Sequence, residues 1–318
     1  MESKLIAAAK TALLDCMGME PAEKVLIVTD TELRELGEIF FNQARDFGGE
    51  AILTEMLPRK SNGEEPPAPV AAAMKEADVV LLVTKKSLSH TQARKEANKA
   101  GARIASLPGL TRDMMARALN ADYEQIETLS KSVSRLLSQG KKARLTTPAG
   151  TDLILDLSGR EGHPDTGFYR EKGMFGNLPA GEAYIAPLEN TAQGVLVVDG
   201  SMAGIGRIKH PITIHIRNGY AEEINGGEEA AILNSLLAPH GKAGRNIAEL
   251  GIGTNPHAEL TGEVLEDEKI LGTVHVALGD NHTIGGIVEV SSHLDGVVLS
   301  PTLEIDGLLI IKDGKPVC

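Results

Sequence analysis

The chain has 318 residues, 42% hydrophobic and 24% charged, so it is long enough to form two domains with sizeable cores. A net charge of -12 argues against a DNA- or RNA-binding surface, since phosphate binding depends on a basic face. No run of about 18 apolar residues is present, which argues against a membrane span, and two cysteines give no disulfide framework, so we expect a cytoplasmic protein.

The first 110 residues alternate between amphipathic stretches and short apolar runs. Residues 3–19 carry charges in a helical pattern and lack the apolar core of a signal peptide. Strands are expected at 25–30, 51–57, 79–85 and 102–109, and helices at 32–47 with Thr31 as cap, through Met74, and at about 89–100. This alternation predicts a doubly wound, Rossmann-like α/β domain. The first strand is followed by TDTELREL, without the glycines of a dinucleotide site.

The composition and pattern of the sequence change near residue 140. Residues 112–138 predict one helix, and after Lys141 the chain is rich in short alternating strands, glycines and turns. One further helix is expected at 227–237. We therefore predict an α/β domain over residues 1–140 and a mostly β (α+β) metal-binding domain over residues 141–318.

A stretch near the C-terminus, residues 268–306, contains three of the nine histidines among short apolar runs: His275, His282 and His293. His293 and Asp295 point to the same face if this segment is a strand, because side chains alternate with period two. Imidazole and carboxylate are the metal ligands expected where thiolates are scarce. The stretch predicts a metal site at strand ends, although a histidine between valines is often only a hydrogen-bonded core residue.

Three acidic residues in the second half, Glu182, Glu249 and Glu268, lie beside glycine, proline or asparagine and close to apolar runs. Each could face inward at the edge of a strand or helix and join the histidines. Each could equally be solvated, because unpaired carboxylates are rarely buried.

The order of several segments resembles the aminopeptidase T family of metallo-aminopeptidases, also known as thermophilic or leucyl aminopeptidases. The segments are TPAGTDLILDLSGR, NLPAGEAYIAP, AELGIGTNP, DEK, VHVALG, SSHLDG and TLEIDG, and they cover most of residues 145–310. The resemblance implies a homodimeric hydrolase that removes N-terminal residues from peptides with a free N-terminus.

The resemblance also implies a pair of divalent ions (Zn, Co or Mn) with a bridging water as nucleophile. The implied ligands are Glu182, Glu249, Glu268, His275, His293 and Asp295, with Glu249 bridging the ions and Asp267 as the alternative to Glu268. Glu182 or Glu249, whichever stays off the metal, would shuttle the proton. His282 stands where the family has a tyrosine, and we expect it to donate to the tetrahedral oxyanion.

Two other readings stay open. The same superfamily resembles, more distantly, an iron-dependent ring-cleaving dioxygenase of dihydroxypyridine, which has a histidine near the Glu249 position. Glu249 argues against that chemistry, but His275, His293 and Asp295 could supply the two-histidine, one-carboxylate face of a mononuclear iron enzyme. The third reading is a non-catalytic scaffold, against which the retention of all ligand types argues.

Overall fold

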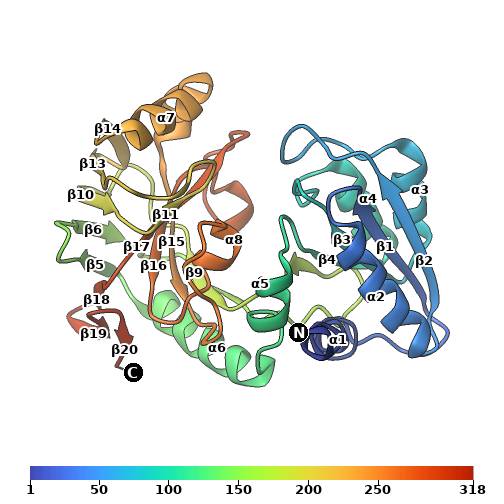
Figure 1. The fold of residues 1–318 in the computed structure, drawn as a ribbon. Coiled ribbons are helices and arrows are strands. Elements are labelled where there is room, and N and C mark those ends of the chain that lie inside the picture. Colours follow the sequence, from blue (N-terminus) through green and yellow to red (C-terminus); the bar gives the residue numbers. More distant parts are fainter. Residues whose placement is uncertain (318) are drawn as a thin grey trace. The chain divides into compact units, whose positions relative to one another are not determined.

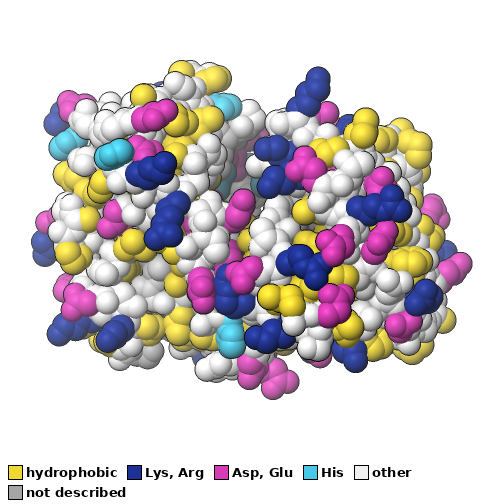
Figure 2. Space-filling view, viewed as in Figure 1, with side chains coloured by type: hydrophobic (Ala, Val, Ile, Leu, Met, Phe, Trp, Pro, Cys, Tyr) yellow, Lys and Arg dark blue, Asp and Glu magenta, His cyan; other side chains and the backbone are white. Residues whose placement is uncertain are grey.

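The computed structural model describes residues 1–317, which form two compact units (Figure 1). Unit 1 comprises residues 1–124 and 167–180, and unit 2 comprises residues 125–166 and 181–318. No helix in the described part of the chain combines the length and apolarity needed to cross a membrane. On the face drawn in Figure 2, acidic and basic side chains are interspersed.

Unit 1 is built on a five-stranded parallel sheet with the order β2-β1-β3-β4-β8. The strands are β1 (Lys24–Asp30), β2 (Glu50–Met56), β3 (Val79–Val83), β4 (Arg103–Ser106) and β8 (Phe175–Asn177). The helices are α1 (Glu2–Lys10), continued by a π-helical segment (Thr11–Cys16), α2 (Arg34–Asp46), α3 (Ala68–Glu76), α4 (Gln92–Ala100) and α5 (Arg112–Arg117). Helices on both faces bury β3 and β4 completely, which explains their continuous apolar sequences.

Local side-chain chemistry sets the ends of these helices. Thr91 accepts a hydrogen bond from the amide of Arg94 and begins α4, and Gly101, at φ +107°, ends it. The expected cap at Thr31 is wrong, because Asp30 accepts from the amides of Glu32 and Leu33 instead. A carboxylate at the end of β1 thus starts the turn into α2.

The single helix predicted over residues 112–138 is two helices, α5 and α6 (Tyr123–Gln139). The carboxylate of Asp122 accepts from the amide of Glu124 and starts the second helix. Val133 and Leu137 of α6 belong to the core of unit 2. The division at residues 124 and 125 therefore precedes the predicted boundary at residue 140, and residues 167–180 return to unit 1 because β8 pairs with β4.

Unit 2 contains two sheets, called B and C. Sheet B has the order β14-β13-β10-β6-β5-β18-β19-β20, with β5 (Lys142–Thr146), β6 (Asp152–Asp156), β10 (Gln193–Val198), β13 (Ile212–Arg217), β14 (Tyr220–Asn225), β18 (Thr302–Ile305), β19 (Leu308–Lys312) and β20 (Lys315–Pro316). Sheet C has the order β12-β11-β17-β16-β15-β9-β7, with β7 (His163–Asp165), β9 (Glu182–Ile185), β11 (Ser201–Met202), β12 (Gly206–Arg207), β15 (Ile247–Gly253), β16 (Val274–Gly279) and β17 (His293–Val298). The helices of unit 2, besides α6, are α7 (Glu228–Leu237) and α8 (Val264–Asp267).

The two sheets share one aliphatic core. Leu250, Val274 and Val276 of sheet C are fully buried in the same cluster as Leu155 and Ile214 of sheet B. Burial of each such side chain contributes roughly 1.5–3 kcal/mol. The expected fold class, a doubly wound α/β domain followed by a mostly β domain, is confirmed. One face of sheet C packs into this core, which leaves its other face for polar residues.

Candidate metal centre

The polar residues of sheet C lie on the face that points away from the core. Side chains alternate along each strand, so Leu250 and Val276 point into the core while Glu249 and His275 point to the opposite face. Neighbouring strands bring the polar positions into register: Gly251 is opposite His275, Ala277 is opposite Asp295, and Gly253 is opposite Glu182. Figure 1 shows β15, β16 and β17 side by side in the middle of unit 2. Strand pairing thus gathers residues that lie more than a hundred positions apart.

Gly251 leaves the space that the imidazole of His275 occupies. A Cβ atom at this position would lie 1.9 Å from His275 Nε2, far inside van der Waals contact. Gly251 therefore serves the site rather than the strand, which glycine weakens.

Glu249 lies between the two histidines and directs one oxygen to each. His275 Nε2 is 3.2 Å from Glu249 Oε1 and 3.2 Å from Glu182 Oε2. His293 Nε2 is 3.4 Å from Glu249 Oε2 and 3.3 Å from Asp295 Oδ1. These donor atoms converge as the ligands of a metal ion do, and Glu249 belongs to both sets.

Three groups of possible metal ligands have donor atoms that all lie within 4.8 Å of one another. They are Glu182, Glu249 and His275; Glu249, His293 and Asp295; and Glu268, His275 and Asp295. Each group holds one histidine and two carboxylates, and each shares a residue with the other two. The structure thus brings together all six predicted ligands, but each histidine lies in a group with carboxylates rather than with the other histidine.

Hydrogen bonds to the ring nitrogens are consistent with ligation through Nε2. His293 Nδ1 donates to the carbonyl oxygen of Asp280 at 2.8 Å, which directs Nε2 toward Glu249 and Asp295. His275 is 1% exposed, and within the described residues its Nδ1 has no hydrogen-bond partner. All polar interactions of its ring are therefore made through Nε2, toward the carboxylates.

Lys269 is a functional candidate that sequence reasoning missed. Its side chain is 1% exposed, and Nζ lies 2.6 Å from Glu182 Oε1 and 2.5 Å from Glu268 Oε1. A buried ammonium is tolerated only with such counter-charges. The one available signal was its place directly after Glu268, in the segment EDEKIL between two apolar runs.

The cluster shifts the pKa of its members in opposite directions. Burial alone would raise the pKa of Glu249, but hydrogen bonds from His275 and His293 outweigh burial and lower it to about 2. Burial and the nearby carboxylates of Asp295 and Glu182 raise the pKa of Glu268 to about 8, although the ammonium of Lys269 acts to lower it. Different surroundings thus favour ionised Glu249 and protonated Glu268 near neutral pH.

Two predicted residues lie outside these groups. Asp267 accepts from the amides of Thr261 and Gly262 at 2.7 and 2.9 Å, so it holds a loop, and Glu268 is the acid that joins the cluster. His282 begins a short 3₁₀ turn (His282–Ile284), and its side chain is exposed. The structure therefore does not bring His282 into any of the three groups.

The donors fit a metal ion of intermediate hardness. Imidazole nitrogen with carboxylate oxygens suits Fe²⁺, Mn²⁺, Co²⁺ or Zn²⁺ and does not suit ions that require thiolates. The fixed Nε2 of His293 and the burial of Glu249 meet the further need for oriented, dry ligands.

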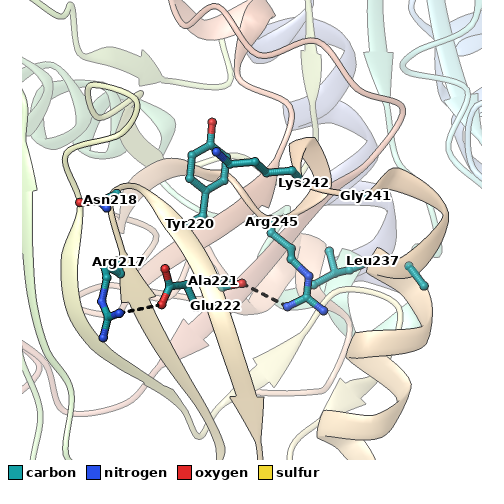
Figure 3. A pocket seen from close by; sticks show the side chains of 10 residues that line it. Arg217, Asn218, Tyr220, Ala221, Glu222, Leu237, Gly241, Lys242 and Arg245 are labelled. Carbon is teal, nitrogen blue, oxygen red and sulfur yellow. Dashed lines mark hydrogen bonds and ion pairs between the residues drawn. The ribbon is translucent and has the colours of Figure 1, made fainter.

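A separate hollow of about 520 Å³ in unit 2 shares no residue with the cluster (Figure 3). Its cations already have protein partners. Arg217 pairs with Glu222, Arg245 donates to the carbonyl of Ala221, and Lys242 lies 4.1 Å from the centre of the Tyr220 ring. The candidate chemistry therefore lies in the cluster and not in this hollow.

The fold and the cluster define a class: an α/β and β protein that carries possible metal ligands on the outer face of an antiparallel sheet. Within this class, the profile of the 2,5-dihydroxypyridine 5,6-dioxygenase (NicX) family matches residues 4–318, so the chain belongs to that family. It is 26% identical over 263 residues to the 2,5-dihydroxypyridine 5,6-dioxygenase of Pseudomonas putida KT2440, covering 77% of this chain and 72% of that protein.

Solved structures extend the likeness of the fold. The 2,5-dihydroxypyridine dioxygenase from Pseudomonas putida KT2440 superposes with a TM-score of 0.82 at 19% identity, covering 100% of this chain and 98% of that one. Wild-type AmpT from Thermus thermophilus superposes with a TM-score of 0.74 at 18% identity, covering 100% of both chains. At these identities the likeness concerns the fold alone.

The expected aminopeptidase is wrong. The family match and the curated relative identify a dioxygenase family, so the predicted hydrolase and protease activities are wrong. The expected role of His282 at an oxyanion depended on peptide hydrolysis and is withdrawn with it. The resemblance to aminopeptidase T reached the right fold, as AmpT superposes over the whole chain. The resemblance did not identify the family, because the same types of metal ligand occur in enzymes that catalyse different reactions.

Proposed function

We propose that this chain opens the ring of a dihydroxylated pyridine with dioxygen as the oxidant and iron(II) as its cofactor. The observation that carries the proposal is the family match across residues 4–318. The relative's name, 2,5-dihydroxypyridine 5,6-dioxygenase, suggests the substrate class and the ring bond that breaks. A dioxygenase places both oxygen atoms in the product, so no external reductant is needed.

Glu249, His293 and Asp295 would hold the iron. This set has one histidine and two carboxylates, where mononuclear iron enzymes commonly have two histidines and one carboxylate. Iron(II) supplies the one-electron chemistry that lets dioxygen react with a spin-paired aromatic ring. Glu182, Glu249 and His275 form an adjoining donor set that would hold a second divalent ion.

The surrounding residues suit an aromatic substrate with acidic hydroxyl groups. Lys269 and His275 hold the pKa of Glu182 below its usual value despite burial, so Glu182 is ionised and can accept a hydrogen bond from a ring hydroxyl through Oε2 where no second ion occupies it. Burial, together with the charges of Glu249 and nearby acids, raises the pKa of Tyr184, so its phenol stays a hydrogen-bond donor.

Tyr184 also offers a flat surface on the same face of sheet C. It is opposite His163 in the pairing of β9 with β7, and the two ring centres lie 5.5 Å apart at 35°. We infer that this pair helps to orient a planar heteroaromatic ring beside the metal ligands.

The test is oxygen uptake by protein loaded anaerobically with iron(II). With 2,5-dihydroxypyridine we expect one dioxygen consumed per ring opened, no uptake by zinc-loaded protein, and none by His293→Ala. His215→Ala, at an exposed histidine on β13, is the matched control and should retain full uptake. Iron-loaded protein that consumes no oxygen with this substrate would refute the proposal.

A further inference from the structure

The cluster contains a cation of its own. Lys269 Nζ lies between Glu182 and Glu268, in contact with one oxygen of each, and its side chain is 1% exposed. Its backbone is also fixed, because the carbonyl of Lys269 accepts from the amide of Asn255 at 2.8 Å and its amide donates to Glu266. A flexible side chain is thus anchored at its root and its tip.

Four carboxylates converge here, from Glu182, Glu249, Glu268 and Asp295. Carboxylates that are buried side by side lose their hydration, and those that are ionised repel one another. The Lys269 ammonium is the one lysine or arginine charge that pairs with these acids among the ion pairs of the described residues. It therefore offsets part of this repulsion when no metal is bound.

The same contacts determine what Glu182 can offer to an ion. Oε1 is bound by Lys269, and Oε2 lies 3.2 Å from His275 Nε2. Glu182 can therefore act as a donor through Oε2 alone. Glu249, Asp295 and His293 have no such contact with Lys269, since its contacts are to Glu182 and Glu268.

We propose that Lys269 is a positioning residue that keeps the metal-free cluster assembled and leaves Glu182 only one oxygen for a metal ion. A divalent ion must then bind despite repulsion from the Lys269 ammonium. Loss of the charge should then have two opposite effects. The metal-free protein becomes less stable, while the ion binds more tightly because the ammonium beside Glu182 and Glu268 no longer repels it. The inference rests on the proposed function only in taking the cluster to be a metal site.

The experiment compares Lys269→Met with the wild type, using zinc(II), which needs no oxygen chemistry. Thermal unfolding is followed with and without the ion, and affinity is measured by competition with a chelator. We expect a lower midpoint for the metal-free variant, a larger rise of the midpoint on adding zinc, and at least about tenfold tighter binding, or about 1.4 kcal/mol.

Arg103→Met is the matched control, since Arg103 is also a buried cation and pairs with Glu23 in unit 1. It should lower the midpoint but leave the rise on adding zinc unchanged. If Lys269→Met is unfolded without metal, folding on adding zinc supports the proposal. Lys269→Met and Lys269→Gln that both stay unfolded with excess zinc, or bind zinc more weakly than the wild type, would overturn it.

Failure of this proposal is distinguishable from failure of the proposed function. A protein that binds zinc as expected but consumes no oxygen when loaded with iron would sink the dioxygenase and leave the role of Lys269 intact. A wild-type protein that binds no divalent ion would remove the basis of both.

Discussion

Glu249 is the residue on which two of the donor groups depend, because its two oxygens face different histidines. Glu182 has no equivalent position, since one of its oxygens is bound by Lys269. The sequence identified both as acids near strand ends, but nothing in their spacing distinguished the shared acid from the one held by a lysine. The resemblance to aminopeptidase T singled out Glu249 as the shared acid, and the contacts of the two side chains show the difference.

Glu249→Gln should therefore weaken metal binding more than Glu182→Gln does. The amide keeps the shape of the side chain but removes the charge from both groups, so we expect at least about a tenfold loss of affinity. Metal content after dialysis against a weak chelator measures the effect, and Glu222→Gln, at an exposed acid on β14, is the control. Equal losses for Glu249→Gln and Glu182→Gln would contradict the shared role.

Gly251→Ala should displace the imidazole of His275, because the added Cβ would lie 1.9 Å from Nε2. We expect loss of metal affinity together with destabilisation of about 1–3 kcal/mol, the usual cost of overpacking. Urea unfolding measures the second effect. In a His275→Ala background the same substitution should cost little, and an undiminished cost there would show that the clash lies elsewhere.

At the scale of elements, the loop of residues 280–292 between β16 and β17 places the His293 ring, because the carbonyl of Asp280 accepts from Nδ1. Glu189 holds this loop. Its Oε1 accepts from Asn281 Nδ2 and from the amide of Ile287, both at 2.9 Å, and its other oxygen pairs with Arg160.

Glu189→Ala should loosen this loop and raise the hydrogen exchange of the Ile287 amide at least about tenfold, because the acceptor of that amide is lost. Acid should act in the same direction. Burial would raise the pKa of Glu189, but hydrogen bonds from Ile287 and Asn281 outweigh burial and lower it. The stabilisation by Glu189 is therefore present above its pKa in the unfolded chain, and it is lost as pH falls through its pKa in the folded chain. Unchanged exchange in the variant would contradict the tether.

Alternating apolar residues predicted the strands of unit 2, because that signal is local. The break between α5 and α6 was missed because one carboxylate, that of Asp122, outweighs a continuous helical pattern. The pairing and register of the strands could not be predicted from the sequence, for another reason. The apolar alternation of a strand such as β16 does not specify which strands it pairs with, and only packing of the whole core selects β15 and β17.

At the scale of the whole molecule, stability should depend on pH through the acidic cluster. Burial and neighbouring acids raise the pKa of Glu268 to about 8 in the metal-free protein. Between the unfolded pKa and this value the folded chain holds a proton that the unfolded chain lacks. Stability therefore falls as pH rises toward about 8, by at most about 1.4 kcal/mol per pH unit for this group.

Urea unfolding of chelator-treated protein between about pH 6 and about pH 8 tests this dependence. The raised pKa values of His275 and His293 act in the same direction, so Glu268→Gln should reduce the slope without abolishing it. An identical slope in Glu268→Gln would show that Glu268 is ionised throughout.

The fold class of each unit could be predicted from the sequence, but the residues at which the units begin and end could not. Composition placed the change near residue 140, whereas the apolar side of α6 packs in unit 2 and residues 167–180 return to unit 1. The possible ligands could be predicted by residue type. The chemistry could not, because glutamate, histidine and aspartate bind several metals, and a match along residues 4–318 was needed to select the dioxygenase family.

The most direct test of the account is anomalous diffraction at the iron edge, from crystals grown without oxygen in the presence of iron(II). We expect an iron peak bounded by Glu249, His293 and Asp295, with Lys269 still in contact with Glu182. A second peak beside Glu182 and His275 would mark the adjoining donor set as occupied. Iron bound elsewhere, or none bound to Glu249, His293 and Asp295, would contradict the account.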